Sequence, residues 1–128
     1  MSAVRPFASI ACLMGAAGVV CAAAASHGGG DQRMAAAAQI LLVHAVASLA
    51  IAFAPIVWRR PFRAVLVANA AMQGGAVLFA ADMARRTLQS EALFPMAAPI
   101  GGTILIGAWV VAALAFAVSR PAGQARTD

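Results

Sequence analysis

Four long apolar stretches set the pattern of the chain. They are Phe7–Ala25, Met34–Val57, Ala64–Ala81 and Ile100–Val118, and none is shorter than 18 residues. A helix of about 18 to 20 residues crosses the roughly 30 Å hydrocarbon core of a bilayer. Strands would need an alternating pattern, which is absent. The pattern predicts an all-α fold, an antiparallel four-helix transmembrane bundle with spans near 7–25, 36–57, 64–82 and 100–118.

Turn-forming residues separate these stretches. The first break is Ser26–Gly30, the second contains Pro61, and the third and longest is Asp82–Pro99. Pro99 stands directly before the fourth stretch, where proline suits a helix start. Residues 119–128 form a polar tail. The whole chain is therefore expected to be one transmembrane domain with short loops.

Composition supports a membrane location. Of the 128 residues, 63% are hydrophobic and only 10% are charged, and a soluble domain of this size could not cover so much apolar surface. The net charge of +5 does not indicate nucleic acid, because the basic residues are all arginines at the ends of apolar stretches. Membrane lipids are the expected partners.

The arginines also predict an orientation. One side of the membrane would carry both termini and the second loop, with Arg5, Arg59, Arg60, Arg63, Arg120 and Arg126. The other side would carry Arg33, Arg85 and Arg86, together with Asp31, Asp82 and Glu91. The positive-inside rule then places both termini in the cytoplasm. Trp58 would lie at the cytoplasmic interface, and Phe94 near the opposite one.

The first stretch has an alternative interpretation. Arg5, an apolar core and Ala23-Ala24-Ala25 resemble a secretory signal peptide with its cleavage site. Cleavage would leave three spans. The apolar part is longer than a usual signal core, which favours a retained helix.

Small residues predict where helices pack closely. In the first stretch, small residues recur at spacings of three and four and form a stripe: Ala8, Ala11, Gly15, Gly18 and Ala22. The third stretch carries Gly74 and Gly75, and the fourth carries Gly101, Gly102 and Gly107. The surfaces packed against them could belong to the same chain, a second copy or another membrane subunit.

Ionisable residues within or beside spans are candidate functional groups. His27, His44 and Asp82 all fall toward the side away from the termini. They could relay protons, bind a metal or hold a lipid headgroup. The alternative is structural, with a neutral His44 hydrogen-bonded across the bundle and His27 ending a helix near water. No His-x₃-His or Cys-x-x-Cys spacing is present, so no metal or cofactor is predicted.

Other polar groups are expected to join helices. Ser48 follows His44 by four residues, and Asn69 and Gln73 form a similar pair. Interhelical hydrogen bonding is the expected role, and the lining of a conduit is the alternative. Exposed N–H groups near Gly101 and Gly102 could hold an anion or lipid phosphate, or simply start a closely packed helix.

Several motifs in order resemble a known family. They are Ala25-Ser26-His27-Gly28, His44-Ala45 with Leu49, Gly75 to Phe79, and Pro99-Ile100-Gly101-Gly102 followed by Gly107-Ala108-Trp109. Together they resemble the YgdD/YwdK-like family of small four-helix bacterial membrane proteins of unknown function. The resemblance implies four retained spans in a bacterial inner membrane, and it supplies no reaction.

The chain departs from that family at one segment. Ala80-Ala81-Asp82-Met83-Ala84 replaces a Ser-Gly-Ser-Leu-Tyr stretch, and the chain has no tyrosine. No nucleophile–base set is evident, so a non-enzymatic accessory, assembly or scaffold role is expected. The alternatives are ion, proton or solute handling through His44, His27 and Asp82, and an intramembrane enzyme using Ser48.

Overall fold

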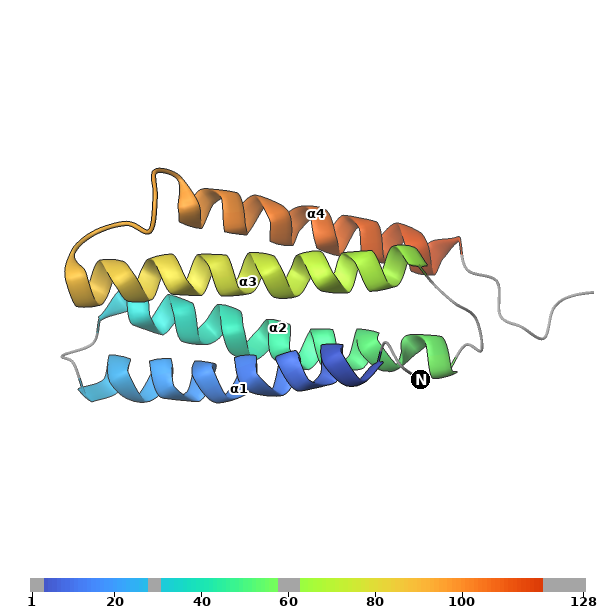
Figure 1. Ribbon diagram of the computed structural model, residues 1–128, viewed down its shortest axis with the longest axis horizontal. Helices are drawn as coiled ribbons and strands as arrows, with labels where there is room; N and C mark the ends of the chain where they lie inside the picture. The colour runs from blue at the N-terminus through green and yellow to red at the C-terminus, as the bar shows by residue number, and fades with distance from the viewer. Residues whose placement is uncertain (1–3, 28–30, 58–62, 119–128) are drawn as a thin grey trace, which may run out of the picture.

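The computed structural model describes residues 4–27, 31–57 and 63–118. It contains α1 (Val4–His27), α2 (Gln32–Val57), α3 (Arg63–Gln89) and α4 (Ala97–Ala117). The helices run alternately in opposite directions, so the start of α1 and the end of α4 lie at the same end (Figure 1). All four helices are long and apolar enough to cross a membrane. The predicted all-α antiparallel four-helix bundle is confirmed.

The helices extend beyond the apolar stretches that predicted them. The third predicted span ends near Asp82, but α3 continues to Gln89, and α4 begins at Ala97 rather than near Ile100. The long predicted break therefore shortens to Ser90–Met96. The charged residues that suggested a break have partners within the structure, so the helix continues through them. The predicted polar tail, Trp58, Arg59 and Arg60 lie outside the described residues.

The bundle is open rather than square. α1 packs along α2, α2 along α3 and α3 along α4, whereas α1 touches α3 only briefly. Within the described residues, the backbone of α4 does not approach α1 or α2. The inner helices, α2 and α3, are consequently the more buried pair. α1 and α4 form the two edges of the arrangement.

Small side chains fill most of the core. Alanines from all four helices are buried, together with larger members such as Met14, Leu41 and Met72. Small residues at a helix contact let the backbones come close, which is how helices associate in lipid. The contact energy is therefore distributed over many short side chains.

The predicted glycine surfaces divide into packed and open positions. A Cβ on Gly75 would lie 2.9 Å from the carbonyl oxygen of Gly101, so these two glycines form the close contact between α3 and α4. A Cβ on Gly18 would meet the side chain of Leu42. By contrast, a Cβ on Gly74 would have nothing within 4 Å, and the same holds for Gly102 and Gly107.

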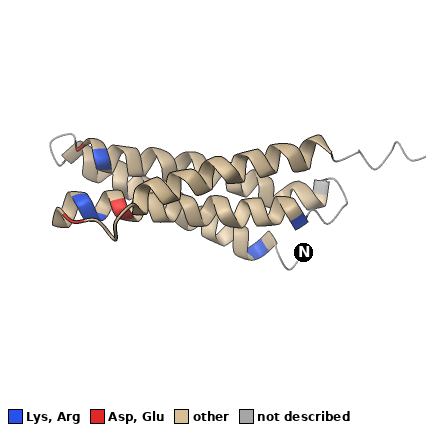
Figure 2. Cartoon of the chain, turned by 90° about the horizontal axis from the view of Figure 1, so that it is seen from above, with Lys and Arg blue, Asp and Glu red and all other residues tan. Residues whose placement is uncertain are grey.

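The charges gather at the two ends of the bundle, as Figure 2 shows. The acidic end, named here for Asp31, Asp82 and Glu91, joins α1 to α2 and α3 to α4. The basic end carries Arg5 and Arg63. Within the described residues, every acidic side chain lies at the acidic end. The position of the acids, with Arg33, Arg85 and Arg86 at the same end, agrees with the charge pattern predicted from the sequence.

Candidate functional site

Five polar side chains are buried among the described residues, and all of them are candidates predicted from the sequence: His44, Ser48, Asn69, Gln73 and Asp82. A polar group inside a membrane span is costly unless it is paired. The partners of each group therefore indicate what it does.

His44 connects α2 to α4 through Trp109. The His44 side chain is 6% exposed. Its Nδ1 lies 2.8 Å from the carbonyl oxygen of Ile40, one turn earlier. The indole Nε1 of Trp109 lies 3.2 Å from Nε2 of His44, and the two rings meet edge to face with centroids 6.1 Å apart. This is a direct side-chain bond between two helices whose backbones are not adjacent.

These two partners define the protonation state of the ring. A carbonyl oxygen only accepts, so Nδ1 of His44 must carry the proton. The indole of Trp109 only donates, so Nε2 must offer a lone pair. His44 is thus the neutral Nδ1–H tautomer with both nitrogens occupied. The expectation of a neutral His44 bonded across the bundle fits this geometry.

A second polar cluster joins α1, α2 and α3. Gln73 donates from Nε2 to the hydroxyl of Ser48 at 2.7 Å and to the carbonyl of Phe7 at 2.8 Å. Asn69 donates from Nδ2 to the carbonyl of Ser48 at 3.2 Å. Ser48 and Asn69 are fully buried. The expected interhelical hydrogen bonds of Ser48, Asn69 and Gln73 are present.

One atom of this cluster has no partner. The buried Oδ1 of Asn69 accepts no hydrogen bond. Rotating the amide by a half turn would place that oxygen against the carbonyl of Ser48, which cannot donate. The amide orientation is therefore determined, and its oxygen stays unsatisfied within the protein.

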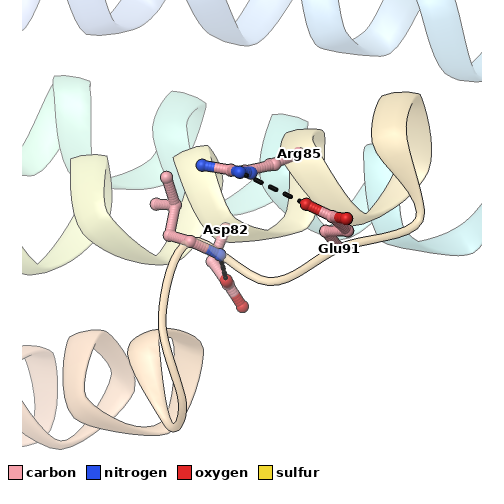
Figure 3. Close-up of polar contacts among 4 residues, drawn as sticks. Asp82, Arg85 and Glu91 are labelled. Atoms are coloured by element: carbon pink, nitrogen blue, oxygen red, sulfur yellow. Dashed lines mark hydrogen bonds and ion pairs between the residues drawn. The ribbon is translucent and has the colours of Figure 1, made fainter.

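Asp82 is a fully buried carboxylate near the acidic end. Its Oδ2 pairs with Nε of Arg86 at 2.7 Å, one turn later on α3. Its Oδ1 accepts the backbone N–H of Leu93 at 2.7 Å (Figure 3). One side chain therefore joins α3 to the loop that leads into α4.

This arrangement bears on the predicted anion contact at Gly101 and Gly102. The positive end of a helix dipole attracts a negative charge. At α4 the residue before the helix, Met96, gives no side-chain cap. The carboxylate of Asp82 bonds to Leu93 in the loop before this helix. Gly101 packs against α3, and Gly102 is half-buried beside open space. A carboxylate of the protein thus bonds to the loop that leads into this helix start.

Asp31 caps α2 at the same end of the bundle. Its Oδ1 accepts the N–H groups of Arg33 at 2.8 Å and Met34 at 2.9 Å, and the hydroxyl of Thr87 at 3.1 Å. The Met34 N–H contributes most to lowering the pKa of Asp31 below its ordinary value, with Thr87 and Arg33 adding to the effect. Asp31 thereby fastens the end of α3 to the start of α2.

His27 is separate from these groups. It is the last residue of α1 and is exposed, and its Nδ1 donates to the carbonyl of Ala23 at 2.8 Å. No hydrogen bond or ion pair joins any two of His27, His44 and Asp82 in the ranges described. Nor does any group of three His, Cys, Asp or Glu side chains lie within metal-binding reach of one another there.

Two apolar grooves open on the sides of the bundle. One, of about 280 Å³, lies between α2 and α4 and is lined by Ala47, Ala50, Ile51, Trp109, Ala112, Ala113 and Phe116. The other, of about 460 Å³, lies between α1 and α3 over Leu41 of α2, and its lining includes Leu13, Met14, Val77 and Ala81. Both follow from the open arrangement, since each separates helices that are not close neighbours.

Sequence reasoning missed the partners rather than the buried polar groups. Trp109, Thr87 and the Leu93 N–H were not expected to form these bonds. The Asp31 cap had a usable signal, because an aspartate directly before an apolar helical run is typical of an N-cap. Trp109 had a weaker one, since an indole N–H within an apolar span finds no acceptor among lipid tails.

Comparison with known proteins identifies a family. The family model described as Protein of unknown function (DUF423) matches residues 9–102. The match runs from α1 into α4 and contains all five buried polar side chains, whereas Trp109 lies beyond it. No curated protein and no solved structure matches the chain. The resemblance to a small family of unknown function is confirmed.

Proposed function

The chain belongs to the DUF423 family of proteins of unknown function, and from the geometry above we propose that it is a non-enzymatic scaffold or accessory subunit of a membrane complex. Its task would be to present helix surfaces to other membrane proteins or to a second copy of itself. Membrane lipids would surround the remaining surface.

The observation that carries this proposal is how the buried polar groups are used. His44 bonds to Trp109, Gln73 and Asn69 bond to Ser48, and Asp82 bonds to Arg86 and Leu93. Each group stabilises a contact between helices or between a helix and a loop. Because these polar groups are already used in contacts that stabilise the fold, they support a structural role for the protein.

The same bonds weaken the case for an intramembrane enzyme. A serine nucleophile needs a base that takes its proton. The hydroxyl of Ser48 faces Gln73, whereas both ring nitrogens of His44 are bonded to Ile40 and Trp109. This arrangement favours packing over nucleophilic catalysis.

The open bundle gives the proposed scaffold its surfaces. The grooves beside α1 and α4 are lined by apolar side chains, many of them small. Small residues allow a further helix to approach closely, which is the main source of helix association in lipid. A partner helix is therefore the proposed occupant of at least one groove.

For location, we propose the bacterial inner membrane with both termini in the cytoplasm. The arginine count of the sequence supports this orientation through the positive-inside rule, with six arginines on the side of the termini and the second loop and three on the other. The four candidate spans support a multi-pass arrangement.

Photocrosslinking in native membranes tests the scaffold proposal. A photoreactive residue at Ala113, inside the α2–α4 groove, is compared with one at Val111, which is exposed but does not line that groove. We expect Ala113 to give a discrete protein adduct and Val111 to give none. Gentle extraction should then recover a particle larger than one chain.

Two results would reject the scaffold proposal together. The protein would run as a monomer after every mild extraction, and the groove position would crosslink to lipid alone. Matched expression of the two variants, checked by immunoblot, ensures that a missing adduct does not reflect a missing protein.

Ion or proton handling through His44, His27 and Asp82 is the competing proposal. It predicts flux across liposomes that contain the purified protein, and loss of that flux in His44→Ala. A flux that depends on His44 would replace the scaffold proposal. Equal leakage from liposomes with and without the protein would remove the competitor.

A further inference from the structure

We infer that a single water molecule is bound at the junction of α1, α2 and α3, donating a hydrogen bond to Oδ1 of Asn69 and accepting one from the hydroxyl of Ser48. This inference does not depend on the proposed scaffold function. It concerns a ligand site inside the part of the bundle that is expected to lie within the membrane.

The first observation is the acceptor without a donor. Oδ1 of Asn69 is buried and unpartnered, and the Asn69 side chain is fully buried on α3. Lipid cannot satisfy such an oxygen, because acyl chains carry no hydrogen-bond donor. No side chain of the cluster donates to this oxygen, so a small donor molecule would supply the missing bond.

The second observation is the donor without an acceptor. The oxygen of Ser48 accepts from Nε2 of Gln73, so its own proton is still available. Two other hydroxyls in helices, those of Ser26 and Thr103, donate to the carbonyl four residues earlier. Ser48 makes no such bond within the described structure, and its side chain is fully buried.

The two unsatisfied groups belong to one cluster and are complementary. Nδ2 of Asn69 bonds to the carbonyl of Ser48, so the two residues already face each other across the α2–α3 contact. They are nonetheless not bonded through their remaining side-chain atoms. A water molecule can accept from one and donate to the other, which is the usual role of buried water in proteins.

The other polar atoms of the cluster indicate which kind of molecule the site can bind. Both hydrogens of the Gln73 amide are used, one by Ser48 and one by the carbonyl of Phe7. No charged side chain takes part in these bonds. The hydrogen-bonding groups therefore favour a neutral molecule that both donates and accepts over an ion.

Water-edited solid-state NMR of the full chain in lipid bilayers tests the site. We expect magnetisation to pass from water to the side-chain amides of Asn69 and Gln73 in the parent protein. Ser48→Ala removes the donor to the water and should reduce the transfer to the level of buried backbone amides such as Met72. Thr103→Ala, which removes a hydroxyl from α4 outside the cluster, should leave it unchanged.

A high-resolution structure in lipid gives a second measurement that needs no variant. We expect an ordered water at hydrogen-bonding distance from both Oδ1 of Asn69 and Oγ of Ser48. A direct bond between these two atoms, with no water, would overturn the inference. So would a parent protein in which neither amide receives magnetisation from water above the Met72 level.

Discussion

At the scale of single residues, the pairing of His44 with Trp109 links helices that are otherwise apart. The bond forms because the neutral imidazole has one nitrogen to donate and one to accept, and the indole supplies the complementary donor. Such bonds between membrane helices are worth about 0.6 kcal/mol on average and up to about 1.7 kcal/mol. One bond of this kind thus adds modestly to stability, but it helps to determine where α4 lies relative to α2.

A double-mutant cycle measures this bond. Trp109→Phe keeps an aromatic ring and removes the N–H donor, and His44→Leu removes the acceptor. We expect each single change to lower the free energy of unfolding in detergent micelles, with a coupling of about 0.6 to 1 kcal/mol. Simple additivity of the two changes would show that the bond contributes nothing.

Asp31 makes a pH-dependent contribution at the same scale. Hydrogen bonds from Met34, Thr87 and Arg33 lower its pKa below the ordinary 3.8. The folded state therefore binds this proton less readily than the unfolded state. The resulting stabilisation is present above the ordinary pKa and is lost as the pH falls through the lowered one.

Asp31→Asn isolates this contribution, because asparagine also caps helices but carries no charge. We expect the parent to lose thermal stability relative to the variant as the pH is lowered from about 6 to about 2. Melting curves across this range give the difference. Parallel curves for the two proteins would contradict the assigned role of the carboxylate.

At the scale of helices, two adjacent glycines of α3 have opposite surroundings. Gly75 contacts α4 at Gly101, whereas Gly74 faces open space. A methyl group at Gly75 must push the backbones of α3 and α4 apart, whereas a methyl group at Gly74 meets no atom within 4 Å. A substitution at Gly75 therefore tests the contact between the helices, and the same substitution at Gly74, in the same helical turn, is its control.

Gly75→Ala should destabilise the bundle by about 1 to 3 kcal/mol, because overpacking forces the backbone to shift. Gly74→Ala should be neutral or stabilising by up to about 1 kcal/mol, because alanine favours helix. Unfolding of both variants in the same detergent provides the comparison. Equal effects at the two positions would show that α3 and α4 are not in close contact here.

Asp82 determines how α3 turns into α4. Its carboxylate is unexposed, whereas the pair formed by Arg85 and Glu91 is partly exposed and 3.4 Å long. Asp82→Asn removes the charge that holds Arg86 and the loop amide of Leu93, so we expect a loss of at least about 2 kcal/mol. Hydrogen exchange at the Leu93 amide should accelerate as well.

Glu91→Gln is the matched control on the same loop. Exposed ion pairs contribute little, so its cost should stay below about 0.5 kcal/mol, with Leu93 exchange unchanged. If the two variants behaved alike, Asp82 would not be the residue that organises the loop.

How far the sequence predicted this structure depends on the kind of feature. The four helices were predictable because an apolar stretch of this length has few other ways to satisfy its backbone in a membrane. The ends of α3 and α4 were not, because the charges of Asp82, Arg85 and Arg86 resembled a break and are instead paired locally. Their pairing depends on a loop whose conformation the pattern does not specify.

The buried polar residues were predictable, but their partners were not. His44, Ser48, Asn69 and Gln73 were identifiable as polar positions within apolar helices. That His44 meets Trp109, 65 residues later, depends on the rotation of α2 and α4 about their axes. Hydrophobic periodicity is almost uninformative about that rotation when a helix such as α4 is apolar on every side.

At the scale of the whole molecule, the proposed orientation rests on the unequal number of arginines at the two ends of the sequence-predicted bundle. A green fluorescent protein fused after Asp128 should be fluorescent in bacterial cells, because it folds in the cytoplasm when the C-terminus lies there. Alkaline phosphatase fused at the same place should be inactive. The reverse pair of results would place the termini on the other side.

The lack of contact between α1 and α4 affects how the protein can tolerate change. Substitutions at sites that share no partner usually add in their energetic effects. On the faces of α1 and α4 that contact neither α2 nor α3, replacements can therefore accumulate independently, without compensating changes in the other edge helix. Diversification should proceed separately along the two flanks, while α2 and α3, which contact neighbours on both sides, constrain each other's evolution.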